Sequence, residues 1–280
     1  METHVFFIIV LASIMHTTWN GMVKKHPNKV TAVSGIVFGH VPFAVIAVIF
    51  LPSPSPESIP YIIGSAFIHQ GYQWYLLTAY QLGDLTKVYP IARGFGPIVV
   101  TIISIIFLGL IISNLAILSI FLISLGIMFV GIFDRSNFKN INILKYSLLT
   151  GFFIGLYSLV DGYGARVSLS AITYMSWSFV LGALMFSVLL KIKKYDNVFK
   201  KVMKDGKKIF FIGGTLGYLI YMIVVWGFTK APIPMVAALR ESSIFFSIFI
   251  GYFFLRERIT LIKIISIILI VAGVIGLKLV

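Results

Sequence analysis

The chain alternates long apolar runs with short polar segments such as "KKHPNK", "QLGDLTK" and "RERIT". Each apolar run is close to the roughly 20 residues that a helix needs to cross the hydrocarbon core of a bilayer. The pattern therefore predicts ten membrane-spanning helices, near residues 4–22, 31–51, 59–80, 88–109, 114–133, 146–163, 171–190, 208–228, 234–255 and 261–279.

The two halves of the sequence share features at a nearly constant spacing. Arg93 and Arg240 are 147 residues apart, and the same offset aligns five identical residues of segment 119–126 with segment 266–273. Five helices in each half would place the halves in opposite orientations in the membrane. We predict an all-α membrane protein with ten transmembrane helices arranged as two inverted five-helix repeats. The two predicted domains are residues 1–140 and 141–280.

Composition excludes several classes of protein. With 59% hydrophobic and 11% charged residues, the chain is too apolar for a soluble domain. The net charge of +14 would suggest nucleic-acid binding in a soluble chain. Here the basic residues lie between apolar runs, where they set the orientation of the chain in the membrane and contact lipid head groups. We therefore expect no nucleic-acid partner. The chain has no cysteine, which excludes disulfides and thiolate metal sites.

The distribution of Lys and Arg predicts the orientation in the membrane. Of the 23 basic residues, 18 lie in or next to the odd-numbered connections between predicted helices. Such a bias favours the cytoplasm for those connections, and hence both termini on the non-cytoplasmic side. The N-terminal segment lacks a basic start and a cleavage site, so it is predicted to be a retained first helix rather than a signal peptide.

Three short segments carry a resemblance to a known family. They are "HTTWNGMVKK" at the end of the first predicted helix, "YSLVDGYGAR" at the end of the sixth, and "LRER" after the ninth. Together with the ten-helix pattern, they resemble the drug/metabolite transporter superfamily, and within it the bacterial EamA-type family. The resemblance implies a multi-pass secondary transporter of the bacterial inner membrane. It also implies alternating access around a central cavity lined by helices 1, 3, 4, 6, 8 and 9.

The chain departs from the family pattern in one place. Many members have an acidic residue in a "GE" element shortly after the fourth helix, whereas this chain has "LGLIISN" there and keeps Glu257 after the ninth helix. The first half is therefore not expected to use a charged gate at that position.

Polar residues inside the predicted spans are candidates for substrate binding or for helix–helix contacts. One face of the first helix carries His16, Trp19 and Asn20. This face either packs against another helix, with the Trp at the membrane interface, or forms part of a cavity. Asp161 could carry a coupled proton, pair with Arg166 or Lys24, or cap a kink. The third helix offers a group that fits either a cavity wall or an aromatic belt: His69, Gln70, Gln73 and Trp74.

Two arginines lie inside apolar runs, in "YPIARGFGP" and "PMVAALRESS". A guanidinium in hydrocarbon is costly unless it is paired or faces a polar cavity. Both arginines follow a proline, so the positive ends of broken helices and two guanidinium forks would together favour an anion. Pairing with Glu241 or Asp161 is the alternative, although Glu241 and Arg240 are consecutive and should point about 100° apart on a helix.

We predict a secondary active transporter of a small anionic or zwitterionic metabolite, such as an amino acid or organic acid. A channel or membrane receptor for a small ligand is the alternative. No GxSxG, HExxH or phosphate-binding loop occurs, so we expect neither an enzyme nor a cofactor, and no metal site. The expected partners are the substrate and membrane lipids, with the chain as a monomer or homodimer. The predicted substrate-binding residues are His16, Trp19, Asn20, His69, Gln73, Trp74, Tyr89, Arg93, Tyr157, Asp161, Tyr218, Arg240 and Ser243.

Overall fold

The computed structural model describes residues 1–133, 141–168, 170–255 and 260–280, with side chains except those of residues 18–20, 85 and 250–255. All regular structure in these ranges is helical. The elements are α1 (Thr3–Lys25), α2 (Lys29–Phe50), η1 (Pro56–Ser58), α3 (Ile59–Leu82), α4 (Leu85–Ile106), α5 (Asn114–Ile132), α6 (Ile141–Val167), α7 (Ala171–Ile192), α8 (Val198–Asp205), η2 (Ile209–Gly213), α9 (Gly214–Lys230), α10 (Ile233–Glu241), α11 (Ser243–Leu255) and α12 (Leu261–Leu279).

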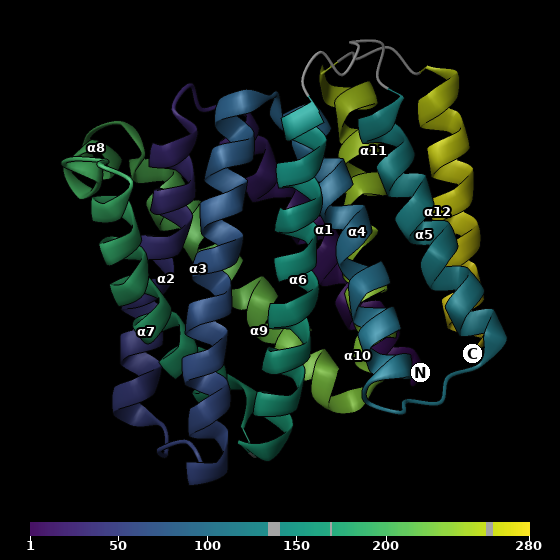
Figure 1. Cartoon of the computed structure of the whole chain (residues 1–280), viewed down its shortest axis with the longest axis horizontal. Helices are drawn as coiled ribbons and strands as arrows, with labels where there is room; N and C mark the ends of the chain where they lie inside the picture. The colour runs from purple at the N-terminus through teal and green to yellow at the C-terminus, as the bar shows by residue number, and fades with distance from the viewer. Residues whose placement is uncertain (134–140, 169, 256–259) are drawn as a thin grey trace.

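The long helices stand side by side in a bundle (Figure 1). Within the described residues, eight helical segments are long and apolar enough to cross a membrane. α3 is not one of them, because His69, Gln70 and Gln73 make its sequence more polar. α10 and α11 are not among them because each is short. The eight segments indicate a multi-pass membrane protein, while the ten-span inverted arrangement stays a prediction.

Helices cover all ten predicted ranges, with two differences. The ninth predicted helix, 234–255, is divided at Ser242, whose hydroxyl donates to the Leu239 carbonyl at 2.7 Å. The long connection after α7 contains the short helix α8, which buries Val198 and Val202 and packs against α2. Side-chain caps set several helix starts, as where Asn28 accepts a hydrogen bond from the Thr31 N–H.

Close packing of small residues places α4, the helix of Arg93, against α6. A Cβ atom on Gly151 would lie 2.6 Å from the Ala92 carbonyl oxygen, and one on Gly155 would lie 2.6 Å from a Val99 methyl group. Such contacts are possible only for glycine, and they let two helices approach closely in a membrane. The backbone next to Arg93 is thereby held against α6.

The two segments that align at the 147-residue offset pack against each other. α5 and α12 lie together at the right of Figure 1. A Cβ on Gly126 would lie 2.9 Å from the Leu269 Cβ, and one on Gly273 would lie 2.6 Å from a carbon of Ile123. Each segment therefore meets its counterpart in the same way, as the two members of a repeat related by a two-fold axis would.

Candidate functional site

A cavity of about 170 Å³ lies between helices from both halves of the chain. By the same measure, a single water needs roughly 10–15 Å³, so the cavity can take a small organic molecule. The resemblance implied lining by the first, third, fourth, sixth, eighth and ninth predicted helices. All six contribute, as α1, α3, α4, α6, α9 and α10, and α2 and α7 contribute as well.

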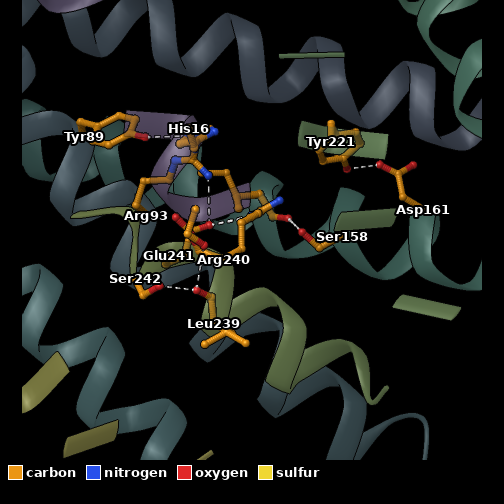
Figure 2. A network of polar contacts seen from close by, with 12 residues as sticks. His16, Tyr89, Arg93, Ser158, Asp161, Tyr221, Leu239, Arg240, Glu241 and Ser242 are labelled. Atoms are coloured by element: carbon orange, nitrogen blue, oxygen red, sulfur yellow. Dashed lines mark hydrogen bonds and ion pairs between the residues drawn. The ribbon is translucent and has the colours of Figure 1, made fainter. Parts of the chain in front are cut away.

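Two buried arginines and one buried glutamate form the arginine cluster, made of Arg93, Arg240 and Glu241 (Figure 2). Arg93 donates from Nη1 to Glu241 Oε1 at 3.0 Å. Arg240 donates to the same oxygen from Nε at 2.9 Å and from Nη2 at 2.7 Å. α4 therefore supplies one guanidinium, and the last turn of α10 supplies the other together with the carboxylate.

The expectation that Arg240 and Glu241 are poor partners is wrong. Consecutive residues do diverge by about 100° at the helix axis. The long Arg240 side chain nevertheless curls back to the carboxylate of its neighbour, at the point where α10 ends. The alternative of structural pairing with Glu241, which the sequence left open, is thus present in the structure for both arginines.

The expected role of broken helix ends does not hold for α4 or for the end of α10. α4 is continuous from Leu85 to Ile106 and passes through Pro90 and Pro97. Arg240 lies in the last turn of α10, near the carbonyl end of that helix. A cation is stabilised at that end by the helix dipole. Neither α4 nor α10 therefore presents a positive helix end to a ligand, and the positive charge that these two helices offer comes from their guanidinium groups.

His16 extends the arginine cluster towards α1. Arg93 Nη2 donates to His16 Nε2 at 2.6 Å, and the Tyr89 hydroxyl lies 3.1 Å from the same nitrogen. A ring nitrogen that accepts from a guanidinium belongs to a neutral imidazole. The ring centre of Tyr89 lies 5.0 Å from Arg93 Cζ, within the range of a cation–π contact. The arginine cluster thus carries two positive charges and one negative charge.

A second polar group, the Asp161 cluster, lies at another part of the cavity and consists of Asp161, His69, Tyr174 and Tyr221. Asp161 Oδ2 accepts hydrogen bonds from His69 Nε2 at 3.2 Å and from the Tyr221 hydroxyl. Its other oxygen, Oδ1, accepts from the Tyr174 hydroxyl at 3.0 Å. The carboxylate is buried, with 1% exposure. Its partners come from α3, α7 and α9, so it joins four helices.

Arg166 is not the partner of Asp161 that the sequence offered as an alternative. It donates instead to the carbonyl oxygens of Phe228 at 2.9 Å and Ala231 at 3.0 Å. These carbonyls belong to the end of α9, where they lack helical partners. Arg166 therefore caps α9.

Tyr157 connects the two clusters. Its ring is stacked on His69, with the centres 4.2 Å apart and the planes at 15°. The Arg240 guanidinium lies 5.9 Å from the centre of the same ring. A substrate that contacts this tyrosine is therefore within reach of both clusters.

Several polar atoms of the cavity wall are buried with no hydrogen-bond partner among the described residues. On α3 these are Ser65 Oγ, Gln70 Oε1 and Gln73 Oε1, and on α2 the atom is His40 Nε2. A buried acceptor of this kind gains when a ligand donates to it. Within the described residues, no group of three or more His, Asp or Glu side chains could hold a metal ion.

The cavity brings together most, but not all, of the predicted site residues. Trp74 is 38% exposed and lies under the Lys193 ammonium, 4.1 Å from its ring centre, because it is one residue past Gln73 and so on another face of α3. Tyr218 shares a hydrogen bond with Ser176 at 2.9 Å, away from the cavity lining. The predicted residues that line the cavity are His16, His69, Gln73, Tyr89, Arg93, Tyr157, Asp161 and Arg240.

Three further predicted site residues are not placed in the cavity lining. Ser243 is fully buried outside it, and its carbonyl accepts a hydrogen bond from the Thr17 hydroxyl at 3.1 Å. The side chains of Trp19 and Asn20 lie outside the described residues, as does Glu257.

Sequence reasoning missed residues that complete both clusters. Glu241 was noted only as a possible ion-pair partner, although an acid inside an apolar run is itself a signal of function. Tyr174 carried no such signal, because a single tyrosine in a span is common at helix contacts. The structure adds to the wall of the cavity Tyr72, Tyr80, Phe179 and Tyr221.

Comparisons with known proteins agree with this architecture. One solved structure, described only as a crystal structure of a protein, superposes with a TM-score of 0.74 over 100% of this chain and 99% of that one. The two sequences are 14% identical, so the likeness concerns the fold alone. No curated protein matches the chain. Residues 142–279 match the EamA-like transporter family, and the chain belongs to this family, within the drug/metabolite transporter superfamily.

Proposed function

We propose that this membrane transporter is a secondary active carrier that moves a small anionic or zwitterionic metabolite by alternating access. The observation that carries the proposal is a pair of buried arginines that line a mostly apolar cavity, with one carboxylate, that of Glu241, only partly offsetting their charge. Burying two cations next to a cavity is costly, and a substrate anion would repay part of that cost. An amino acid or an organic acid has the required carboxylate.

Different parts of the cavity would bind different parts of the substrate. A carboxylate can accept two parallel hydrogen bonds from a guanidinium, which fixes both its position and its orientation. Around the arginines, the wall is aromatic, with Tyr72, Tyr157 and Tyr221 available for the apolar body of a substrate. The unpartnered oxygens of Gln70 and Gln73 could accept hydrogen bonds from its far end.

Contacts between the halves support alternating access by two inverted repeats. Arg93 and Arg240, which the 147-residue offset relates, meet on one glutamate oxygen. The matching segments of α5 and α12 also pack reciprocally. Two such halves can rock about a shared site and open it to each side of the membrane in turn.

The proposed orientation has both termini outside the cytoplasm. In Figure 1, the lysine-rich helix α8 lies towards the upper end of the bundle, whereas both termini lie towards the lower end. A reporter that is active only in an oxidising compartment should therefore be active when fused after Val280. A well-expressed but inactive fusion would reverse the orientation.

Transport by a carrier can be separated from the rival functions. The substrate is sought by thermal-shift screening of purified protein against carboxylates and amino acids, because a ligand of the native state raises the melting temperature. In proteoliposomes, a carrier should give saturable uptake that is accelerated by substrate on the opposite side. Uptake without saturation or acceleration would indicate a channel, and binding without uptake would indicate a receptor.

A further inference from the structure

We propose that Glu241 sets the charge of the substrate group bound at the arginine cluster to one negative charge, so that the carrier selects monoanionic groups and rejects dianionic ones. This inference rests on the proposed function, because it concerns the valence of the anion at that same site. It assigns to Glu241 the role of a specificity-determining residue.

The first argument is the charge count in the buried cluster. Arg93, Arg240 and Glu241 are at most 7% exposed as side chains, so water does little to screen them. Arginine stays charged in proteins, and a carboxylate held by two guanidinium groups stays ionised. His16 accepts from Arg93 and is neutral. The sum is one net positive charge, which a single negative charge neutralises.

The second argument is that N–H groups remain for a ligand while Glu241 stays in place. The hydrogen bonds within the described residues use Nε and Nη2 of Arg240, and Nη1 and Nη2 of Arg93. Arg240 Nη1 and Arg93 Nε donate to none of those residues, and both side chains line the cavity. A substrate anion can thus bind beside Glu241 without displacing it.

The third argument is the way in which Glu241 is held. All three of its hydrogen bonds fall on Oε1, and Oε2 is buried with no partner among the described residues. Structural ion pairs usually satisfy both oxygens of a buried carboxylate, since an unpaired acceptor costs free energy. The presence of a glutamate at this position is therefore better explained by the negative charge of Glu241 than by the hydrogen bonds that it accepts.

Asp161 does not change this count. In Figure 2 it lies well apart from the arginines, beyond Tyr221. Its two oxygens already accept hydrogen bonds from His69, Tyr174 and Tyr221. A second negative charge on the substrate would therefore meet Glu241 near the arginines, or Asp161 at the other part of the cavity, and would be repelled at both.

Phthalate and 2-carbamoylbenzoate test the proposal. They have nearly the same shape, and at pH 7.5 the first carries two negative charges and the second only one. The wild-type protein should bind 2-carbamoylbenzoate about tenfold more tightly than phthalate, because like charges in a buried site repel strongly. Glu241→Gln preserves size and leaves two net positive charges, so it should reverse the preference to about tenfold in favour of phthalate.

Titration calorimetry of the purified full-length protein measures both dissociation constants, with Glu57→Gln as the matched control. Glu57 is exposed on η1, so its loss should leave the wild-type preference unchanged. If both compounds bind but Glu241→Gln retains the wild-type preference, the role assigned to Glu241 is wrong and the anion site stands. If neither compound binds to either protein, the anion site itself is contradicted, and this inference with it.

Discussion

Two buried carboxylates, Asp161 in the cavity wall and Glu241 on the two arginines that line it, have partners that differ in kind. Glu241 is held by two arginines, which can only donate hydrogen bonds and do not lose their protons. Asp161 is held by two tyrosine hydroxyls and a histidine, each of which can either donate or accept. The surroundings of Glu241 therefore fix it as an anion, whereas those of Asp161 can adjust if it takes up a proton.

We propose that the two clusters have separate tasks because of this difference. A permanent anion between two cations sets the electrostatic balance for a bound substrate. A carboxylate among reversible partners can change its charge without leaving a buried polar group unsatisfied. Asp161, which joins α3, α6, α7 and α9, is also placed so that a change in its charge would act on the packing of four helices.

The largest expected effect is that of Asp161→Asn on proton-driven uptake. If Asp161 carries a coupled proton, which is one of the roles that its place in the sequence allows, the amide of Asn cannot take up that proton. A pH gradient should then no longer drive net uptake in proteoliposomes, while exchange of substrate across the membrane continues. The measurement compares the two modes of flux for the identified substrate at the same protein density.

The two modes of flux also give the outcomes that would contradict this role of Asp161. Uptake by Asp161→Asn with the wild-type pH dependence would show that protons are not coupled there. Loss of both modes in a well-folded variant would instead place Asp161 in substrate binding or in the conformational change.

The next largest effect is that of Arg93→Gln or Arg240→Gln on affinity. Either change removes a guanidinium fork and leaves the arginine cluster without net charge, so the dissociation constant of the identified substrate should rise ten- to a hundredfold. This corresponds to roughly 1.4–2.7 kcal/mol. Calorimetry or thermal-shift titration measures it.

Arg166→Gln provides the matched control for the arginine variants. Arg166 donates to backbone carbonyls at the end of α9 and does not line the cavity. It should lower stability and leave affinity unchanged. Wild-type affinity in both cavity variants, or a substrate that proves to be an organic cation, would contradict the anion site.

The positions of the helices could be predicted from the sequence, because spans of nearly constant length are dictated by the bilayer. The division at Ser242 could not, because "LRESSIF" contains no proline or glycine to mark a break. The interruption coincides with the buried residues Arg240 and Glu241, so tertiary contacts rather than local propensity account for it.

The site could be predicted in part. Arg93, His69 and Asp161 were identified because charge or polarity inside a span has few explanations. The direction of a side chain was harder to foresee, as Trp74 and its neighbour Gln73 show. One points away from the cavity and the other lines it. The rotation of α3 relative to the neighbouring helices determines which of the two side chains faces the cavity. No short-range sequence pattern predicts that rotation.

A moderate effect is expected from Pro90→Ala, which alters the helix that carries Arg93. Proline lacks an N–H, so the Thr86 carbonyl cannot receive its usual helical hydrogen bond, and the span is easier to bend there. Alanine restores the bond and should slow transport severalfold at unchanged expression and unchanged substrate affinity. Uptake kinetics in proteoliposomes test this, and rates equal to those of the wild type would show that α4 does not need to bend at Pro90.

The smallest effect is expected from Tyr174→Phe, which removes one of the three hydrogen bonds to Asp161. The ring should stay in place, because it packs tightly against Gly164. A hydrogen bond inside a membrane protein contributes about 0.6 kcal/mol on average, so the melting temperature should fall only slightly. Tyr163→Phe is the matched control, since its hydroxyl makes no hydrogen bond to the described residues, although its ring lies under the Arg166 guanidinium. If Tyr174→Phe destabilises the protein as much as Asp161→Asn does, His69 and Tyr221 do not compensate for the lost donor, and Asp161 is rigidly held as Glu241 is.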